Sequence, residues 1–250
     1  MVLPMADTFP RPDRSGTTDR VYRGIMVDLE NGRMVPGQRL VETELAERFG
    51  VGRNAVREAM QRLAVRGVVD LTPNRSPSIR RFTREETRDV LAISRLMTEF
   101  AAGLAANHFV RESHGPLLDQ AMTQLAHAHS EDEPGMFSRA RRAFYRAILS
   151  IGGNRELQRL FPAIGMHIIY AQYQSRQLRD IRMQDYEAMA AAIAARDAVA
   201  ARRSGASHVQ RVQDIIAAMT RSEHSASPPD RPLVTHGDFG GNSDGKGLTE

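Results

Sequence analysis

The order of the predicted elements in residues 18–83 is the feature that most constrains the fold. Thr18 or Asp19 is expected to cap a first helix, with Gly32 just past its end. After a Pro-Gly turn, the spacing of apolar residues predicts a second helix over about 42–49 and a third over about 53–66. Glycines follow both helices, where chains commonly leave the helical conformation. The segment is therefore predicted to contain three short helices joined by tight turns.

Two short strand candidates follow the third helix. Residues 68–71 and 78–81 carry β-branched residues, and Thr72-Pro73-Asn74 between them is a typical turn. Three helices followed by a hairpin are the order of a winged helix-turn-helix. In that fold the third helix packs on the first two through one apolar face, and four residues have the required spacing: Val56, Ala59, Met60 and Leu63.

From residue 84 onward the apolar pattern is helical, without a strand pattern. The predicted fold class is mainly α, with an N-terminal winged helix-turn-helix (18–83) and a C-terminal all-helical bundle (84–224). The Pro-, Gly- and Ser-rich ends, 1–17 and 225–250, are expected to be disordered tails. The bundle helices are expected over about 84–109, 115–129, 134–150, 155–176, 180–195 and 197–220.

Polar side chains follow one face of the third predicted helix. Arg53, Arg57 and Gln61 are spaced i, i+4 and i+8, with Asn54 beside the first of them. The formal net charge of +4 is densest in residues 18–83, and arginine suits bidentate contacts with phosphate and guanine. A solvated face without a partner would have the same spacing. The order of the surrounding elements favours DNA as the partner.

A dense motif covers residues 36–67, PGQRLVETELAERFGVGRNAVREAMQRLAVRG. It closely resembles the winged helix-turn-helix of the GntR family of bacterial transcription regulators. The resemblance implies that Arg53 and Arg57 contact bases or phosphates in the major groove of double-stranded operator DNA. It also implies that the wing tip around Arg75 reaches the minor groove. Thr43, in the second predicted helix, is a further candidate DNA contact.

Two positions depart from the family pattern. Gly52 stands where the family usually has Ser or Thr, which keeps a tolerable helix cap but removes a hydroxyl that could contact phosphate. The usual wing glycine is replaced within residues 74–77. The second departure leaves the detailed wing contacts open. The identification of the domain does not depend on them.

Three stretches of the second half carry a further resemblance. They are SRLMTEFAAGLAA with Arg95 and Glu99, FSRARRAFYRAILSIGGNREL, and AMAAAIAARDAVAARRSGASHV. They are similar to the all-helical FCD effector domain of the FadR branch, so the combined resemblance covers about residues 18–220. It implies a homodimeric transcription factor, most often a repressor, that reads a pseudo-palindromic operator and responds to a small effector in the helical domain.

The same resemblance bears on a metal site. Many FCD domains hold a divalent metal with an Asp, a His four residues later and two further His. In this chain those positions fall on Arg141, Tyr145, Tyr186 and His208. A guanidinium repels a cation and cannot coordinate it, so we expect no bound metal and no other cofactor. One alternative set of ligands stays open, although its spacings do not favour it: His127, His129 or His167.

The four replaced or retained positions should still converge on one cavity, with Arg95 nearby. In metal-bearing relatives the metal commonly helps to bind a carboxylate effector. Here the guanidinium of Arg141 would pair directly with a small organic acid, and the hydroxyls of Tyr145 and Tyr186 would complete the hydrogen bonds. Two alternatives remain. Arg141 pairs with an internal acid in a closed cavity, or the ligand is a long-chain acyl-CoA.

Composition and missing motifs exclude other classes of protein. The absence of cysteine excludes a disulfide scaffold, a thiolate zinc finger and a thiol nucleophile. No apolar run approaches about 18 residues and no signal peptide is recognisable, so a cytoplasmic location without a membrane partner is expected. No GxSxG, HExxH or Gly-rich phosphate loop occurs, so the chain is not expected to be an enzyme. An enzyme in the helical domain and a bundle without an effector remain minor alternatives.

Overall fold

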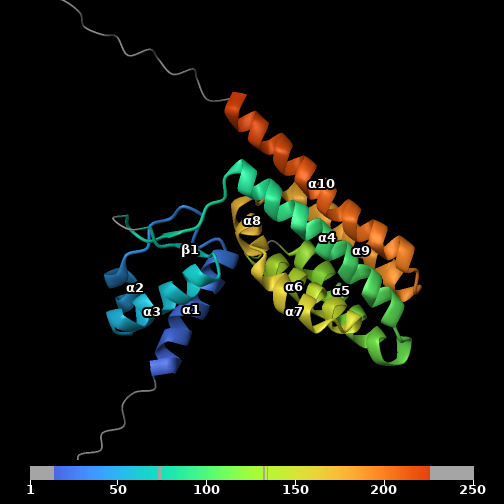
Figure 1. Ribbon diagram of the computed structural model, residues 1–250, viewed down its shortest axis with the longest axis horizontal. Coiled ribbons are helices and arrows are strands. Elements are labelled where there is room, and N and C mark those ends of the chain that lie inside the picture. The colour runs from blue at the N-terminus through green and yellow to red at the C-terminus, as the bar shows by residue number, and fades with distance from the viewer. Residues whose placement is uncertain (1–13, 73–74, 132, 134, 226–250) are drawn as a thin grey trace, which may run out of the picture.

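The computed structural model describes residues 14–72, 75–131, 133 and 135–225. It has two lobes, a small one of three helices and a two-stranded sheet and a large one of helices (Figure 1). The predicted mainly α fold, a winged helix-turn-helix followed by a helical bundle, is therefore confirmed. Predictions that concern residues 1–13, the Pro73-Asn74 turn and residues 226–250 lie outside the described residues.

The small lobe is held together by the apolar faces of its first and third helices. Val21, Ile25 and Leu29 are buried, as are the four apolar residues of the third helix whose spacing predicted that face. The two strands are antiparallel, with Val69 opposite Ile79, and are shorter than predicted. The elements are α1 (Arg14–Glu30), α2 (Glu42–Phe49), α3 (Arg53–Val65), β1 (Val69–Asp70) and β2 (Ser78–Ile79).

The start of α1 corrects the prediction for the first helix and for the N-terminal tail. The helix begins at Arg14, so residues 14–17 are helical and Thr18 lies inside the helix. Thr18 is buried, and its hydroxyl donates a hydrogen bond to the Glu58 carboxylate of α3 over 3.1 Å. Asp19 forms an ion pair with Arg62 of α3 at 3.0 Å. Both residues predicted as caps thus make tertiary contacts, which the local pattern does not reveal.

The large lobe is a helical bundle in which α4 and α10 lie side by side (Figure 1). Their close approach depends on Gly205, because a Cβ at this position would lie 2.9 Å from the backbone oxygen of Thr98. No helix among the described residues is long and apolar enough to cross a membrane. The helices are α4 (Arg84–His108), α5 (Arg111–Ser130), α6 (Met136–Gly152), α7 (Arg155–Leu160), α8 (Met166–Gln172), α9 (Arg176–Ala194) and α10 (Ala198–Ser225).

Two helix predictions for this lobe are wrong. The single helix expected over 155–176 is divided into α7, a 3-10 turn over Phe161–Ala163 and α8. Pro162 cannot donate a backbone hydrogen bond, and Gly165 has φ +78°, a left-handed conformation that favours glycine. The helix expected over 115–129 starts earlier, because α5 begins at Arg111 and continues through Pro116. The break at 161–165 matters most, because it produces the short helix α8.

The hydrophobic core continues from the small lobe into the large one. Buried residues of α1 and α3 belong to the same cluster as Phe82 of the connecting segment and as Ile168 and Ile169 of α8. Phe82 packs directly against Gly165, where a Cβ would lie 2.8 Å from its ring. A second core cluster fills the bundle farther from the small lobe. The two lobes are therefore joined by apolar packing as well as by the chain.

Candidate functional site

The candidate DNA-contacting side chains of α3 lie on its outer face. Arg53, Asn54, Arg57 and Gln61 are exposed, whereas the opposite face is buried in the small lobe. Gly52 occupies the N-cap position and provides no side-chain cap hydrogen bond. A helix start of this kind presents backbone N–H groups that suit a phosphate. The face therefore has the exposure that a recognition helix needs.

Arg57 is held by an acidic side chain of the preceding helix. Its Nε donates to both carboxylate oxygens of Glu42, at 2.8 and 2.9 Å. This hydrogen bond and the negative charge of Glu42 raise the pKa of Arg57, which stays a cation. Thr43 is exposed on α2, next to Glu42, and Arg75 is exposed between the strands. The pair orients Arg57, and DNA phosphate would compete with the Glu42 carboxylate for it.

A buried polar centre lies in the large lobe, where α6, α8 and α9 meet. Arg141 and Tyr145 come from α6, Tyr170 from α8 and Tyr186 from α9. The Cζ of Arg141 lies 3.3 Å from the centroid of the Tyr170 ring, and the hydroxyls of Tyr170 and Tyr186 are 3.2 Å apart. The Nε of Arg141 is buried without a hydrogen-bond partner, and no ion pair to Arg141 is found among the described residues. The centre therefore holds a positive charge that no carboxylate among the described residues pairs with.

Arg182 is a second buried arginine in this centre, which the sequence analysis missed. It is 3% exposed, and its Cζ lies 4.0 Å from the centroid of the Tyr170 ring. Its Nε and one Nη have no hydrogen-bond partner. Burial lowers its pKa, and the nearby Tyr170 and Tyr186 act in the opposite direction. The available signal was its position one helical turn before Tyr186, which places both on the same face of α9.

His208 faces the same centre from α10 but is tied to an acid. Its Nδ1 lies 3.0 Å from an oxygen of Asp185, and both residues are buried. Burial, together with the charges of Arg182 and Arg141, lowers the pKa of His208 to about 3. The neutral ring therefore donates Nδ1–H to Asp185, whose other oxygen accepts from Arg211. Asp185 compensates Arg211 and not Arg141.

The space at this centre is nearly filled by side chains. The cavity measures about 10 Å³, which is room for about one water molecule. Arg141, Tyr145 and His208 line it, and Tyr186 contacts the rings of Tyr145 and His208 from behind. Arg95 does not line it. The α4 residues that do are Leu91, Ser94 and Thr98.

The residues of this centre do not fit a divalent cation. Two buried guanidinium groups lie at the ring of Tyr170, and they would repel a metal ion. Among the described residues, no group of three or more His, Cys, Asp or Glu side chains is placed to hold one. The histidines of the alternative set do not meet at one point either. His129 contacts Asp180, whereas His167 lines another cavity than the one at this centre.

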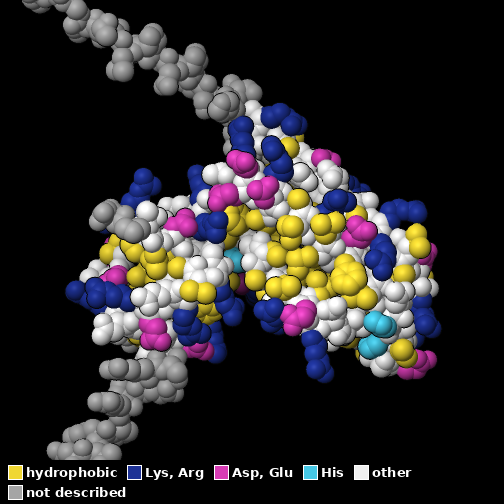
Figure 2. Space-filling model, in the orientation of Figure 1, with side chains coloured by type: hydrophobic (Ala, Val, Ile, Leu, Met, Phe, Trp, Pro, Cys, Tyr) yellow, Lys and Arg dark blue, Asp and Glu magenta, His cyan; other side chains and the backbone are white. Residues whose placement is uncertain are grey.

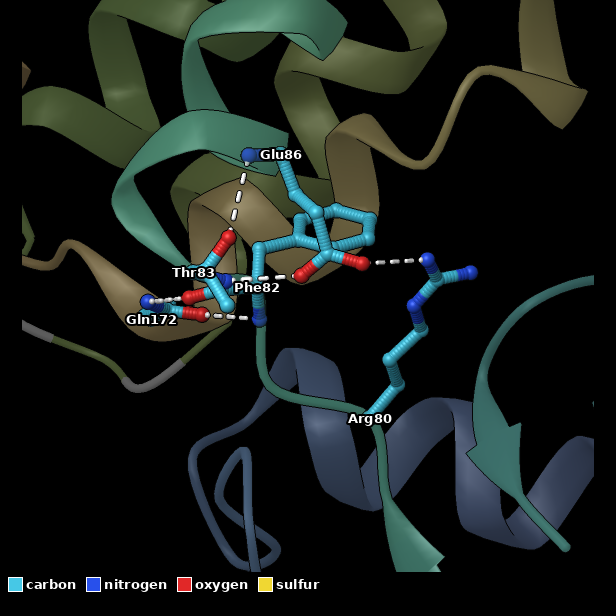
Figure 3. Close-up of polar contacts among 5 residues, drawn as sticks. All are labelled: Arg80, Phe82, Thr83, Glu86 and Gln172. Carbon is cyan, nitrogen blue, oxygen red and sulfur yellow. Dashed lines mark hydrogen bonds and ion pairs between the residues drawn. The ribbon is translucent and has the colours of Figure 1, made fainter. Parts of the chain in front are cut away.

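The segment between the lobes is fastened to both α4 and α8 (Figure 3). Gln172, the last residue of α8, accepts from the backbone N–H of Phe82 at 3.0 Å and donates to its carbonyl at 2.9 Å. Thr83 and Glu86 form a reciprocal capping box at the start of α4. The second oxygen of Glu86 accepts from Arg80, next to β2, at 2.9 Å. These hydrogen bonds connect α8 and the start of α4 to the chain that leads to the wing.

A winged helix with an exposed basic recognition face, joined to a helical bundle with a buried charged centre, defines the class of two-domain transcriptional regulators. Residues 17–78 match the model of the bacterial regulatory proteins of the gntR family, and residues 86–211 match that of the FCD domain. The chain belongs to the GntR family and carries an FCD domain, as its motifs predicted. Regulators of this family bind operator DNA and are not enzymes.

Individual relatives agree with this assignment. A probable D-xylose utilization operon transcriptional repressor of Paenarthrobacter nicotinovorans is 24% identical over 66% of this chain and 72% of its own length. The regulator LutR of Bacillus subtilis is 23% identical over 75% of this chain and 95% of its own length. Among solved structures, McbR/YncC of E. coli has a TM-score of 0.68 at 21% identity, covering 82% of this chain and 98% of its own. This structural likeness concerns the fold.

Proposed function

We propose that this regulator is a homodimeric repressor that reads a pseudo-palindromic operator with two copies of α3. The exposed side chains of Arg53, Asn54, Arg57 and Gln61 support the base and phosphate contacts. Thr43 and Arg75 would add contacts from α2 and the wing. The proposed DNA partner places the protein in the cytoplasm. Operator affinity should fall steeply with salt, because phosphate contacts release counterions, and salt-insensitive binding would contradict the proposal.

An apolar stripe on α4 supports the dimer. Ile93, Leu96 and Phe100 are 51%, 55% and 41% exposed, although they are large and apolar. Their i, i+3 and i+7 spacing places them on one face of the helix. Figure 2 shows hydrophobic side chains gathered on this face of the large lobe, with charged residues around them. A second copy of the chain would cover the stripe, as two operator half-sites require.

The effector of this repressor is a small carboxylate that pairs with Arg141. The observation that carries this is the pair of buried guanidiniums, Arg141 and Arg182. The Nε of each and one Nη of Arg182 have no hydrogen-bond partner. A buried charge is costly unless it is paired and hydrogen-bonded. A carboxylate would supply both, with Tyr145 and His208 lining the central cavity beside Arg141 and Tyr186 behind them. Arg95 does not line the central cavity, so it would contribute positive charge from outside it.

Ligand screening by thermal shift and calorimetry tests the effector class. We expect organic acids, and not their amides, to raise the melting temperature of the full chain, and Arg141→Ala to abolish the shift. Arg159→Ala is the matched control, because Arg159 is exposed and pairs with Glu156 on α7. A long-chain acyl-CoA is screened in parallel. An Arg141→Ala protein that keeps every response would overturn the carboxylate effector.

A further inference from the structure

A cavity of about 290 Å³ lies between the two lobes. One side of its lining belongs to the small lobe and includes Tyr22, Met26 and Glu30 of α1 and Arg66 just after α3. The other side belongs to α6 and to the segment 161–167, which contains the break between α7 and α8. Each domain therefore supplies part of the cavity, which exists only while the lobes keep this arrangement.

The polar groups of this cavity favour an anion. Arg141 lines it as well as the small central cavity, and its side chain is buried with Nε unpaired. The Nε2 of His167 is also buried without a hydrogen-bond partner. The acid of the lining, Glu30, forms an ion pair with Arg142. Three further arginines line the cavity: Arg66, Arg142 and Arg146.

His167 is neutral in this environment. Burial, and then the charges of Arg141, Arg142 and Arg66, lower its pKa to about 4. Arg66 comes from the small lobe, so the positive potential in the cavity is produced by both domains. A neutral imidazole can donate an N–H to a carboxylate without adding a further buried charge. Arg141 would then supply the compensating charge and His167 a directed hydrogen bond.

The remaining walls are apolar and consist of thioether, aliphatic and aromatic groups. Met26 faces the cavity from α1, Leu149 from α6, Phe161 and Pro162 from the 3-10 turn, and Met166 from the start of α8. Such walls suit a hydrocarbon body, because transfer of apolar surface from water into an apolar environment is favourable. A ligand that satisfies both kinds of wall is an anion at one end and apolar at the other.

We propose that this interdomain cavity is the effector site, and that it binds a monocarboxylate with an aromatic or aliphatic body. The carboxylate pairs with Arg141 and His167, and the body lies between Met26 of the small lobe and Met166 of the large one. This inference rests on the proposed carboxylate-responsive regulator and adds the place and the shape of its ligand. The alternative is a small acid in the central cavity of the bundle, which would not touch α1.

The position of the cavity provides a mechanism for regulation. A ligand held between α1 and α8 interacts with both domains, so it stabilises the arrangement in which the cavity exists. The ligand would contact Met166 and His167 at the start of α8. The last residue of the same helix, Gln172, makes hydrogen bonds with Phe82 of the connecting segment. By thermodynamic linkage, operator DNA must change the ligand affinity by the same factor as the ligand changes the DNA affinity.

Calorimetric titration of the full chain with defined probes tests the site. The probes are 4-phenylbutyrate and octanoate, with 4-phenylbutanol as the uncharged match and acetate as the match without a body. The variant Met26→Glu places a negative charge in the cavity from the small lobe. Val27→Glu is its control, because Val27 follows on the same helix but is exposed outside the lining. Arg141→Met removes the proposed carboxylate partner.

We expect at least one of the two amphipathic acids to bind about tenfold or more tightly than either match, and Met26→Glu and Arg141→Met each to weaken it about tenfold or more. Val27→Glu should keep the affinity. In the wild type, hydrogen exchange should slow in both α1 and α8 when the acid binds, which tests the site without relying on a folded variant.

Three results would overturn the interdomain site. The first is binding that Arg141→Met weakens and Met26→Glu does not, with slowed exchange in the bundle alone. That result would leave the proposed carboxylate effector intact and place it in the central cavity. The second is binding that neither variant changes. The third is that neither amphipathic acid binds at millimolar concentration. Operator binding is measured separately, and it would still support the proposed DNA-binding regulator.

Discussion

The guanidinium of Arg141 lies over the ring of Tyr170, with its Cζ 3.3 Å from the ring centroid and its Nε unpaired. Cation–π attraction offsets part of the free energy of desolvation, but it does not satisfy the Nε–H group. The ligand-free protein therefore keeps a buried charge that is incompletely compensated. Such an arrangement reduces stability and is ready to accept an anion.

Replacing Arg141 should consequently stabilise the ligand-free protein. Methionine has a similar length and no charge, so we expect Arg141→Met to raise the free energy of unfolding by about 1–4 kcal/mol. Denaturant unfolding followed by circular dichroism measures this. The exposed control Arg159→Met should change stability by less than about 0.5 kcal/mol. A strong loss of stability in Arg141→Met would show that the residue has an internal partner and a structural role.

The Arg57–Glu42 pair leads to opposite expectations for its two members. Arg57→Ala should weaken operator binding by about 1–3 kcal/mol and reduce discrimination between operator and scrambled DNA. Glu42→Gln should leave binding unchanged or strengthen it, because it removes a carboxylate that competes with phosphate, and an exposed pair adds at most about 1 kcal/mol. Fluorescence anisotropy with selected operator fragments checks both, with Arg155→Ala in the large lobe as control. Equal losses in both variants would indicate a purely structural pair.

A charge in the α4 stripe should dissociate the proposed dimer. Phe100→Glu places a carboxylate on the stripe, where burial against a second copy would be costly. Multi-angle light scattering should show monomers at concentrations at which the wild type is dimeric. Leu160→Glu is the control, because Leu160 is 46% exposed on α7, away from the stripe. A dimeric Phe100→Glu protein would place the interface elsewhere.

Stability should depend on the protonation of His167. Its pKa falls from 6.5 to about 4 on folding, because of burial and the charges of Arg141, Arg142 and Arg66. The unfolded chain then binds the proton more tightly, so this contribution is complete above about pH 6.5 and is lost as the pH falls towards 4. The loss is of the order of 3 kcal/mol. Between these pH values, the melting temperature should change less with pH for His167→Gln than for the wild type. The exposed His127→Gln should follow the wild type.

The hydrogen bonds between Gln172 and Phe82 should couple the two domains. Gln172→Ala leaves the backbone N–H and carbonyl of Phe82 without these partners, which we expect to lower the free energy of unfolding by about 1–3 kcal/mol. Ligand binding and ligand-free operator binding should remain, while the effect of ligand on operator affinity decreases. Titration of DNA with and without ligand measures this coupling. An unchanged coupling would mean that the signal passes through another contact.

Local patterns were sufficient to predict much of the molecule. The apolar spacing around Val56 and Leu63 and the glycines after the helices predicted the winged helix-turn-helix, because these signals arise within single turns of helix. The spacing of Arg53, Arg57 and Gln61 predicted a common exposed face for the same reason. Motif resemblance also indicated that Arg141, Tyr145 and His208 would meet, and they line one cavity. Their roles in binding, and those of the DNA face, remain predictions.

The amino-acid sequence alone therefore determined the class of protein and its two domains, and it placed Arg141 where the FCD resemblance implies an acidic metal ligand. Tertiary structure decided which charges are compensated. Asp185 accepts hydrogen bonds from His208 and Arg211, and the Nε atoms of Arg141 and Arg182 are left without a hydrogen-bond partner. This result depends on how separate helices pack. The break before α8 and the cavity between the lobes also arise from packing. Burial and pairing are sums over contacts distant in sequence, and no local period encodes them.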